Sequence, residues 1–189
     1  STAEEAATQI LDKWGKVDIL INAAGGNTPG AVVNPEDDLF ELSLKEFAEV
    51  AELNLQGAVI PSMVFARHMC ENKRGSIINF SSMSVERAIT RVAGYSAGKA
   101  GLENFTRWLA CEIAMRYGEG IRVNAIAPGF FIGEQNKSLL TNTDGKLTER
   151  GQQIISLTPM GRFGRSEELN GVIHFLSGRA SSFVTGTVI

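Results

Sequence analysis

The sequence has few of the residues that build metal sites and disulfide frameworks. Its 189 residues include only two cysteines and two histidines. Cys70 and Cys111 are far apart, and neither belongs to a CxxC or HxxxH spacing. The sequence therefore predicts no metal site and no disulfide framework, and we expect both cysteines to be buried, reduced thiols.

Long runs of one kind of residue are also missing. No apolar run approaches the length that spans a bilayer, and the first residues lack the basic and apolar regions of a signal peptide. The net charge is -3 and Lys and Arg form no cluster, which argues against nucleic acid or an anionic membrane as the main partner. We therefore expect a cytoplasmic protein that acts on a small molecule.

Helical and strand patterns alternate along the chain. Apolar residues recur at helical spacing in four stretches, at residues 2–14, 44–71, 94–117 and 166–177. Short apolar runs indicate buried strands at residues 17–21, 76–80 and 121–126, and a further strand at residues 183–189. The alternation predicts right-handed crossovers and an α/β fold, with a Rossmann-like, doubly wound parallel sheet in three α/β/α layers.

Three details of this pattern lead to further expectations. Asn54, Gly57 and Pro61 interrupt the longest helical stretch, so we expect a bend or break there. The chain starts on a helix and stops inside a strand pattern, so we expect residues 1–189 to form a single domain that lacks its first βαβ portion and its C-terminal end. Residues 130–164 are the one long irregular stretch, and we expect them to form a partly ordered lid with a short helix.

Three loops follow the first three predicted strands, at residues 22–26, 81–84 and 128–131. The carboxyl ends of parallel strands meet at one edge of a sheet, and ligands of open α/β sheets bind outside that edge. We therefore expect the three loops to share one ligand.

Side chains able to exchange a proton lie beside these loops. Tyr95 and Lys99 are four residues apart at the start of a helix, so both project from one face, where an ammonium favours the phenolate form of a tyrosine. Ser82 follows the preceding strand and can donate a hydrogen bond to a substrate oxygen. Each residue also has an ordinary interpretation, as a solvated helix pair, a turn serine or, for Asn54, a core amide. Their joint occurrence at the ligand-binding edge favours catalysis.

Together these residues resemble the short-chain dehydrogenases/reductases. The resemblance covers nearly the whole chain and rests on five motifs, Asn22-Ala-Ala-Gly25, Leu53-Asn-Leu-Gln-Gly57, Ile78-Asn-Phe-Ser-Ser82, Tyr95-Ser-Ala-Gly-Lys99 and Arg122-Val-Asn-Ala-Ile-Ala-Pro128-Gly129. It implies a dinucleotide-binding catalytic domain that moves a hydride between a nicotinamide cofactor, NAD(H) or NADP(H), and a carbonyl or secondary alcohol. The segment that usually decides between the two cofactors is not in the sequence.

The resemblance also implies a role for each motif residue. Tyr95 would be the general acid/base, Lys99 would tune it and hold the nicotinamide ribose, Ser82 would polarise the carbonyl and Asn54 would position a proton-relay water. The implied cofactor-binding residues are Asn22, Ala23, Ala24, Gly25, Asn54, Tyr95, Lys99, Pro128, Gly129, Phe130 and Phe131. The sequence departs from the family in lacking the first strand with its Gly-rich phosphate loop, and in having Gly133 where a Thr often contacts the cofactor.

Within this family, the stretch from Gly133 to Gly164 is similar to the D-mannonate oxidoreductases, which interconvert D-fructuronate and D-mannonate with NAD(H). This similarity favours NAD(H) and a sugar-acid substrate. The candidate substrate residues are Ser84, Arg91, Gln135 and Asn136, and the other cations able to pair with a carboxylate are Arg87, Lys137, Arg150 and Arg162. For any one of these cations a solvated surface role is more common than contact with a substrate, and turn or cap roles explain Gln135 and Asn136 equally well.

Two alternatives to a mannonate-type enzyme stay open. One is another short-chain reductase, for a polyol, a gluconate or a 3-oxoacyl substrate; the other is a cofactor-binding protein without turnover. The family resemblance implies a homotetramer. The long helices agree with it because they have more apolar residues than one buried face needs, including Met63, Trp108 and Cys111.

Overall fold

The computed structural model describes residues 2–133 and 137–189, apart from the side chain of Ser138. Three parallel strands form the sheet, in the order β1 (Ile19–Asn22), β2 (Gly75–Phe80) and β3 (Ile121–Ile126). The register pairs Asn22 with Asn79 and Asn79 with Ala125, so the carboxyl ends of the strands coincide.

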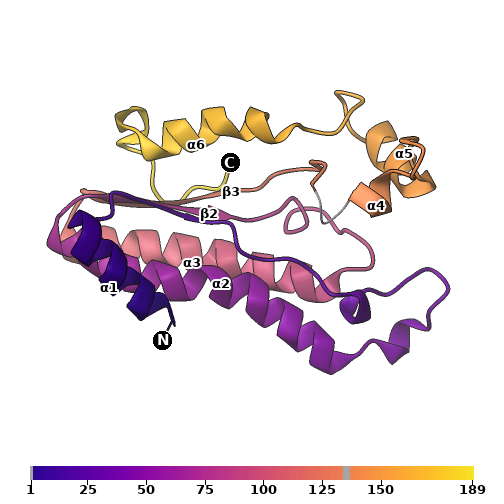
Figure 1. Cartoon of the computed structure of the whole chain (residues 1–189), viewed down its shortest axis with the longest axis horizontal. Helices are drawn as coiled ribbons and strands as arrows, with labels where there is room; N and C mark the ends of the chain where they lie inside the picture. The colour runs from indigo at the N-terminus through magenta and orange to yellow at the C-terminus, as the bar shows by residue number, and fades with distance from the viewer. Residues whose placement is uncertain (1, 134–136) are drawn as a thin grey trace.

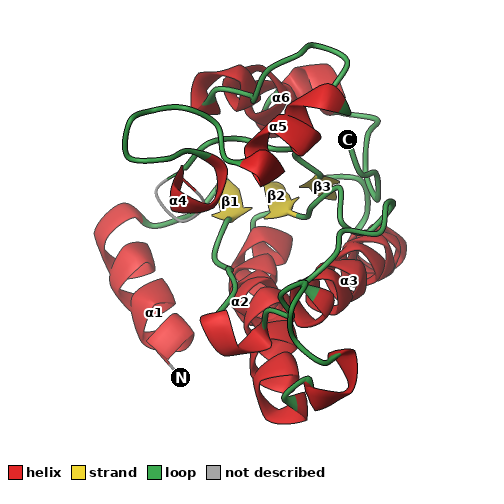
Figure 2. Cartoon of the chain, turned by 90° about the vertical axis from the view of Figure 1, so that its right-hand side faces the viewer, coloured by secondary structure: helices red, strands yellow, loops and turns green. Residues whose placement is uncertain are grey.

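Helices cover both faces of this sheet. One layer contains α1 (Thr2–Trp14), α2 (Leu44–Glu71) and α3 (Ala93–Tyr117), and the opposite layer contains α4 (Lys137–Leu140), α5 (Glu149–Ser156) and α6 (Asn170–Ser177) (Figures 1 and 2). The predicted α/β fold with three layers is therefore confirmed.

The central strand β2 separates two hydrophobic clusters. Ile77 packs with side chains of α2 and α3, whereas its neighbour Ile78 packs with Leu176 of α6 on the other face. Both isoleucines are fully buried because β2 is covered on both faces, which explains its continuous apolar run. The edge strand β1 differs, because Ile19 and Ile21 are each 44% exposed. The expectation that β1 is buried is wrong for its outer face, since α6 packs over β2 instead.

Helix α2 is continuous. Ser43 caps it by accepting a hydrogen bond from the backbone N–H of Glu46 at 3.3 Å, and the helix runs for 28 residues with Pro61 inside it. A proline inside a helix costs about 3 kcal/mol, and the packing of α2 against α3 and the sheet offsets that cost. The expected bend or break near Gly57 and Pro61 therefore does not interrupt the helix.

The C-terminal part differs from the prediction in two respects. The helix predicted over 166–177 begins with a 3₁₀ turn, Ser166–Leu169, before α6. The strand predicted over 183–189 is reduced to a parallel bridge between Val188 and Ala125. The chain turns sharply before this bridge, with Gly186 at a φ of 74°, so pairing with β3 starts late. Further 3₁₀ turns lie at Pro29–Ala31, Leu39–Glu41 and Arg179–Ser181.

Residues 130–133 and 137–164 form a small unit that is tied together at its base. The backbone N–H of Gly164 donates to the carbonyl of Phe130 at 3.0 Å. Inside the unit, Thr148 caps α5 by accepting from the N–H of Gly151 at 3.1 Å, and Leu140 packs against Gly151. The short helix expected in this stretch is confirmed as α5.

Cysteine burial was predicted incorrectly. Cys70 is half-buried and Cys111 is exposed, and both are free thiols. Cys111 lies on α3 between Trp108 and Met115, which are exposed too, because no other element in the described part of the chain covers this face. No helix among the described residues combines the length and apolarity needed to cross a membrane.

Candidate active site

The loops after the strands meet at one edge of the sheet, which faces the viewer in Figure 2. The N–H of Ser81 donates to the carbonyl of Ile126 at 2.7 Å, and that of Met83 donates to the carbonyl of Pro128 at 3.3 Å. These bonds hold the loop after β2 against the loop after β3.

Lys99 connects helix α3 to this edge. Its side chain is 4% exposed, and its Nζ donates to the carbonyl oxygen of Phe80 at 2.7 Å. The same Nζ lies 5.7 Å from the centre of the Tyr95 ring. Burial lowers the pKa of Lys99 to about 8. Lys99 therefore lies between the Tyr95 ring and the carbonyl of Phe80 at the end of β2, and Phe80 is two residues before Ser82.

Asn54 fixes the loop after β1. The side chain is fully buried; its Oδ1 accepts from the N–H of Gly26 at 3.1 Å, and its Nδ2 donates to the Gly26 carbonyl at 2.7 Å and the Val50 carbonyl at 2.9 Å. A Cβ on Gly25 would lie 2.6 Å from Asn54 Oδ1 and 3.2 Å from Lys99 Nζ, and Gly25 has a φ of 153°. Only glycine fits between these two side chains.

The side chain of Asn22 points into the core rather than into the loop. Its Nδ2 donates to Ser62 Oγ at 2.9 Å and to Asn79 Oδ1 at 2.8 Å. Ala23 and Ala24 follow it and are exposed. If this loop binds a cofactor, the Asn22 amide acts by holding strands and helix together, and the contacts come from the residues after it.

Two serines after β2 have unused hydrogen-bonding capacity. Ser82 is half-buried and its Oγ accepts from the N–H of Ser84 at 3.2 Å. Ser84 is 6% exposed, and its own Oγ has no partner among the described residues. A buried hydroxyl without a partner costs about 1–3 kcal/mol, so Ser84 is well placed to bind a ligand group.

The loop after β3 is more open. Pro128 and Phe130 are half-buried and Gly129 is exposed, while the ring of Phe131 packs over Gly164. The predicted substrate residues Gln135 and Asn136 lie outside the described residues.

One buried group near the site was not predicted. Glu103 accepts a hydrogen bond from Ser81 Oγ at 2.6 Å and another from Arg107 at 3.0 Å. It is buried on α3, four residues after Lys99, and it anchors the residue before Ser82. The sequence did contain a signal for this buried group, namely a glutamate on the apolar face of the helical pattern that forms α3.

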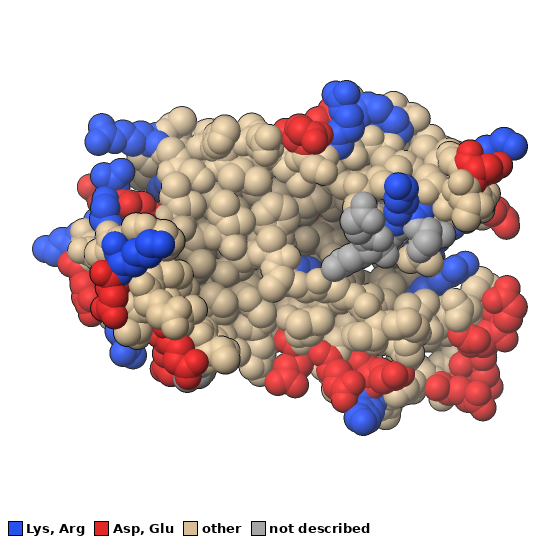
Figure 3. All heavy atoms as spheres, in the orientation of Figure 1, with Lys and Arg blue, Asp and Glu red and all other residues tan. Residues whose placement is uncertain are grey.

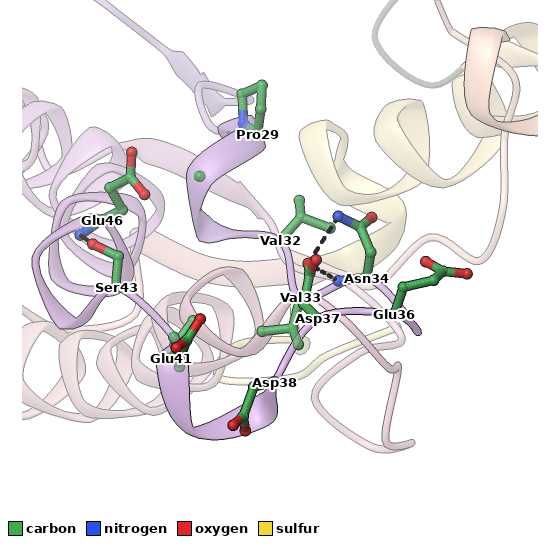
Figure 4. A pocket seen from close by; sticks show the side chains of 12 residues that line it. Pro29, Val32, Val33, Asn34, Glu36, Asp37, Asp38, Glu41, Ser43 and Glu46 are labelled. Carbon is green, nitrogen blue, oxygen red and sulfur yellow. Dashed lines mark hydrogen bonds between the residues drawn. The ribbon is translucent and has the colours of Figure 1, made fainter.

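Two cavities lie close to the carboxyl edge. The larger, about 580 Å³, is lined by several carboxylates, and none of the predicted catalytic residues lines it (Figure 4). In it Asp37 accepts hydrogen bonds from the backbone N–H and the side chain of Asn34. The described residues contain no group of three His, Cys, Asp or Glu arranged to hold a metal ion. The second cavity, about 530 Å³, is lined by Asn34, Pro35, Glu36, Arg91, Glu149, Arg150 and Gln153.

The chain is similar to known oxidoreductases over almost its whole length. A family profile described as enoyl-(acyl carrier protein) reductase matches residues 1–189. The uncharacterized oxidoreductase UxuB of Bacillus subtilis is 43% identical over 98% of this chain and 69% of its own length.

Solved structures are similar as well. A Haemophilus influenzae protein with bound NAD, assigned only provisionally as a D-mannonate oxidoreductase, superposes with a TM-score of 0.88 at 41% identity, over 99% of this chain and 70% of that one. A gluconate 5-dehydrogenase from Burkholderia cenocepacia, in complex with NADP and tartrate, gives a TM-score of 0.85 at 30% identity, over 99% and 68%. The fold, the motifs at the edge of the sheet and these matches agree, and the protein belongs to the short-chain dehydrogenase/reductase family of NAD(P)-dependent oxidoreductases.

Proposed function

We propose that the protein reduces the keto group of a sugar acid with NADH, in the reaction that converts D-fructuronate to D-mannonate, and that it also runs in reverse. The observation that carries the catalytic part is the convergence of Lys99 and Tyr95 on the end of β2. The substrate part is supported by the sequence of residues 133–164 and by the similarity to a protein provisionally assigned as a D-mannonate oxidoreductase. That protein binds NAD, which favours NAD(H) over NADP(H).

The residues at the carboxyl edge fit a nicotinamide cofactor. An ammonium has three hydrogen-bond donors, and Lys99 uses one of them on Phe80 within the described part of the chain. The remaining donors suit ribose hydroxyls. Glycine and alanine at positions 23–25 and Gly129 leave room for close backbone contact.

The mechanism divides the work between three side chains. When bound, the nicotinamide supplies the hydride. The hydroxyl of Tyr95 gives its proton to the carbonyl oxygen, and the hydroxyl of Ser82 donates a hydrogen bond to that same oxygen. Lys99, held by Phe80, keeps positive charge beside Tyr95. In the reverse direction Tyr95 accepts the proton of the alcohol.

The experiment compares Tyr95→Phe with the parent and with Tyr117→Phe, whose hydroxyl lies at the exposed end of the same helix. NADH oxidation is followed with D-fructuronate, and cofactor binding by fluorescence titration. We expect Tyr95→Phe to lose about 10²–10⁴-fold in turnover with NADH affinity kept, and Tyr117→Phe to match the parent. A Tyr95→Phe variant that turns over normally would contradict the assignment.

A substrate panel tests the remaining part. Activity with D-fructuronate supports the proposal. Activity with 5-keto-D-gluconate or a 3-oxoacyl thioester alone, or NADH binding without turnover of any ketone, overturns it in favour of another short-chain reductase or of a binding protein.

We also infer a cytoplasmic homotetramer, assembled through α2 and α3. The support is a set of exposed apolar side chains on these two helices, namely Leu53, Ile60, Met63, Trp108 and Met115. Such side chains gathered on two neighbouring helices are typical of a surface that another subunit covers.

A further inference from the structure

Arg91 and Arg150 differ from the other half-buried arginines in what surrounds their side chains. Among those others, Arg122 donates a hydrogen bond to Ser181, and Arg162 forms a bidentate ion pair with Glu168. Arg91 and Arg150 are half-buried too, yet among the described residues neither guanidinium has an acceptor or a carboxylate within 4.0 Å. Half-buried guanidinium groups normally have a partner, so these two have capacity for a ligand.

The fold brings these two residues together from distant parts of the chain. Arg91 precedes α3, Arg150 is the second residue of α5, and both line the cavity of about 530 Å³. Arg91 has a φ of 77°, which is unfavourable for a residue with a side chain, and its carbonyl accepts from the N–H of Val33 at 3.0 Å. Backbone strain of this kind tends to occur where a side chain is aimed for function.

The charges in the cavity indicate what it binds. Both arginines line this cavity, and burial, followed by the positive charge of Arg91, lowers the pKa of Arg150, so the two cations repel each other. An anion placed between them would relieve this repulsion. Glu36 and Glu149 line the same cavity, so its formal charge balances to zero, which suits one carboxylate better than a phosphate dianion.

The neutral lining is consistent with a polyhydroxy ligand. Asn34 and Gln153 present amide groups that can both donate to and accept from hydroxyls. The surface view shows Lys and Arg side chains at the opening between the α4–α5 segment and the layer below, with Asp and Glu side chains on the lower rim (Figure 3). A rim that has charges of both signs again suits a hydroxylated acid rather than a strongly charged ligand.

We propose that Arg91 and Arg150 jointly bind the carboxylate of the substrate, while Asn34 and Gln153 contact its hydroxyls. Arg91 is four residues from Tyr95, at most about 14 Å along an extended chain, which a hexuronate and an arginine side chain can bridge. The cavity then selects hydroxylated monocarboxylic acids over neutral ketoses. This inference rests on the proposed function, because it assigns the carboxylate of that substrate to a site.

Three variants test the pair: Arg91→Gln, Arg150→Gln and, as a control, Arg67→Gln, which removes an exposed arginine on α2. Two readouts are used, the KM for D-fructuronate and the shift of the melting temperature caused by D-mannonate. We expect each of the first two variants to raise KM about ten- to a hundred-fold with kcat less affected, and to lose the stabilisation by D-mannonate. The Arg67→Gln variant should match the parent in both readouts.

Folding failure is distinguishable from loss of the site. Because each substitution removes one of two facing cations, the ligand-free variants should melt at or above the parent's temperature. If the parent reduces D-fructuronate and both variants keep its KM, the carboxylate site is overturned and the proposed function stands. If the parent reduces only neutral ketones, the proposed function fails, and the carboxylate site fails with it.

Discussion

At the scale of single residues, Lys99 imposes an electrostatic cost on the fold. Its ammonium is 4% exposed, and burial lowers its pKa from 10.5 to about 8. Below pH 8 the folded and unfolded chains both hold this proton, so the folded state bears the whole cost of burying the charge. Between pH 8 and 10.5 only the unfolded chain still holds it, and the cost disappears as the pH rises.

Lys99→Met should therefore change how stability depends on pH. A difference of two to three pKa units corresponds to about 3 kcal/mol. We expect the free energy of unfolding of the parent, relative to the variant, to rise by up to that amount between pH 7.5 and 10.5. Urea unfolding of both proteins across this range measures it, and titrating groups remote from Lys99 cancel in the difference. A difference that stays constant with pH would contradict the buried charge.

At the scale of elements, glycines set the distance between α2 and α3. A Cβ on Gly98 would lie 2.6 Å from the carbonyl oxygen of Ala51 and 2.9 Å from the Cβ of Asn54. Gly101, one turn later on α3, has room, because its Cβ would meet only side-chain carbons of Leu55 at 3.5 Å. The first glycine permits close packing at the site, whereas the second does not need to be glycine.

The two glycines should respond oppositely to alanine. Gly98→Ala forces the helices apart and should destabilise the protein by about 1–3 kcal/mol, with loss of activity because Asn54 and Lys99 shift. Gly101→Ala should stabilise it by about 0.5–1 kcal/mol, because alanine favours a helix over glycine. Chemical denaturation of both variants gives the signs, and a Gly98→Ala variant as stable as the parent or more stable would show that the packing at Gly98 is not tight.

The sequence predicted whole elements better than it predicted their limits. The bounds of α2 and β3 follow from patterns within each element, and the structure confirms them. Strand β1 starts two residues later than predicted, because its pairing can begin only where β2 begins, with Ile19 opposite Ser76. No local pattern contains that information.

In the candidate site, too, the sequence predicted features within one element but not contacts between elements. The spacing of Tyr95 and Lys99 put both on one helical face, but the bond from Lys99 to the Phe80 carbonyl depends on tertiary packing. The meeting of Arg91 and Arg150 joins segments 59 positions apart. The sequence offered Arg91 as a candidate substrate residue and Arg150 as one cation among several, without indicating that the two meet. Contacts between distant segments were the part that periodicity and spacing could not supply.

At the scale of the whole molecule, assembly can be tested by one tryptophan. Trp108 is 50% exposed on α3 within the apolar surface proposed for subunit contacts, and Trp14 is 64% exposed on α1. Trp108→Glu should dissociate the tetramer, because a charge buried in an apolar interface is costly, whereas Trp14→Glu should leave it intact. Size-exclusion chromatography with light scattering measures both. A parent that is monomeric would refute the assembly.

Residues 130–164 leave and rejoin the rest of the protein at neighbouring points, where Gly164 donates to Phe130. Closing a loop costs only about 0.6 kcal/mol more for each doubling of its length. Insertions and deletions within this segment, which we call the cassette, therefore cost little folding free energy, and they leave β3 in register with β2. A chimaera that exchanges the cassette with that of a relative should keep its sheet, so recognition of new compounds can evolve independently of the machinery for hydride transfer.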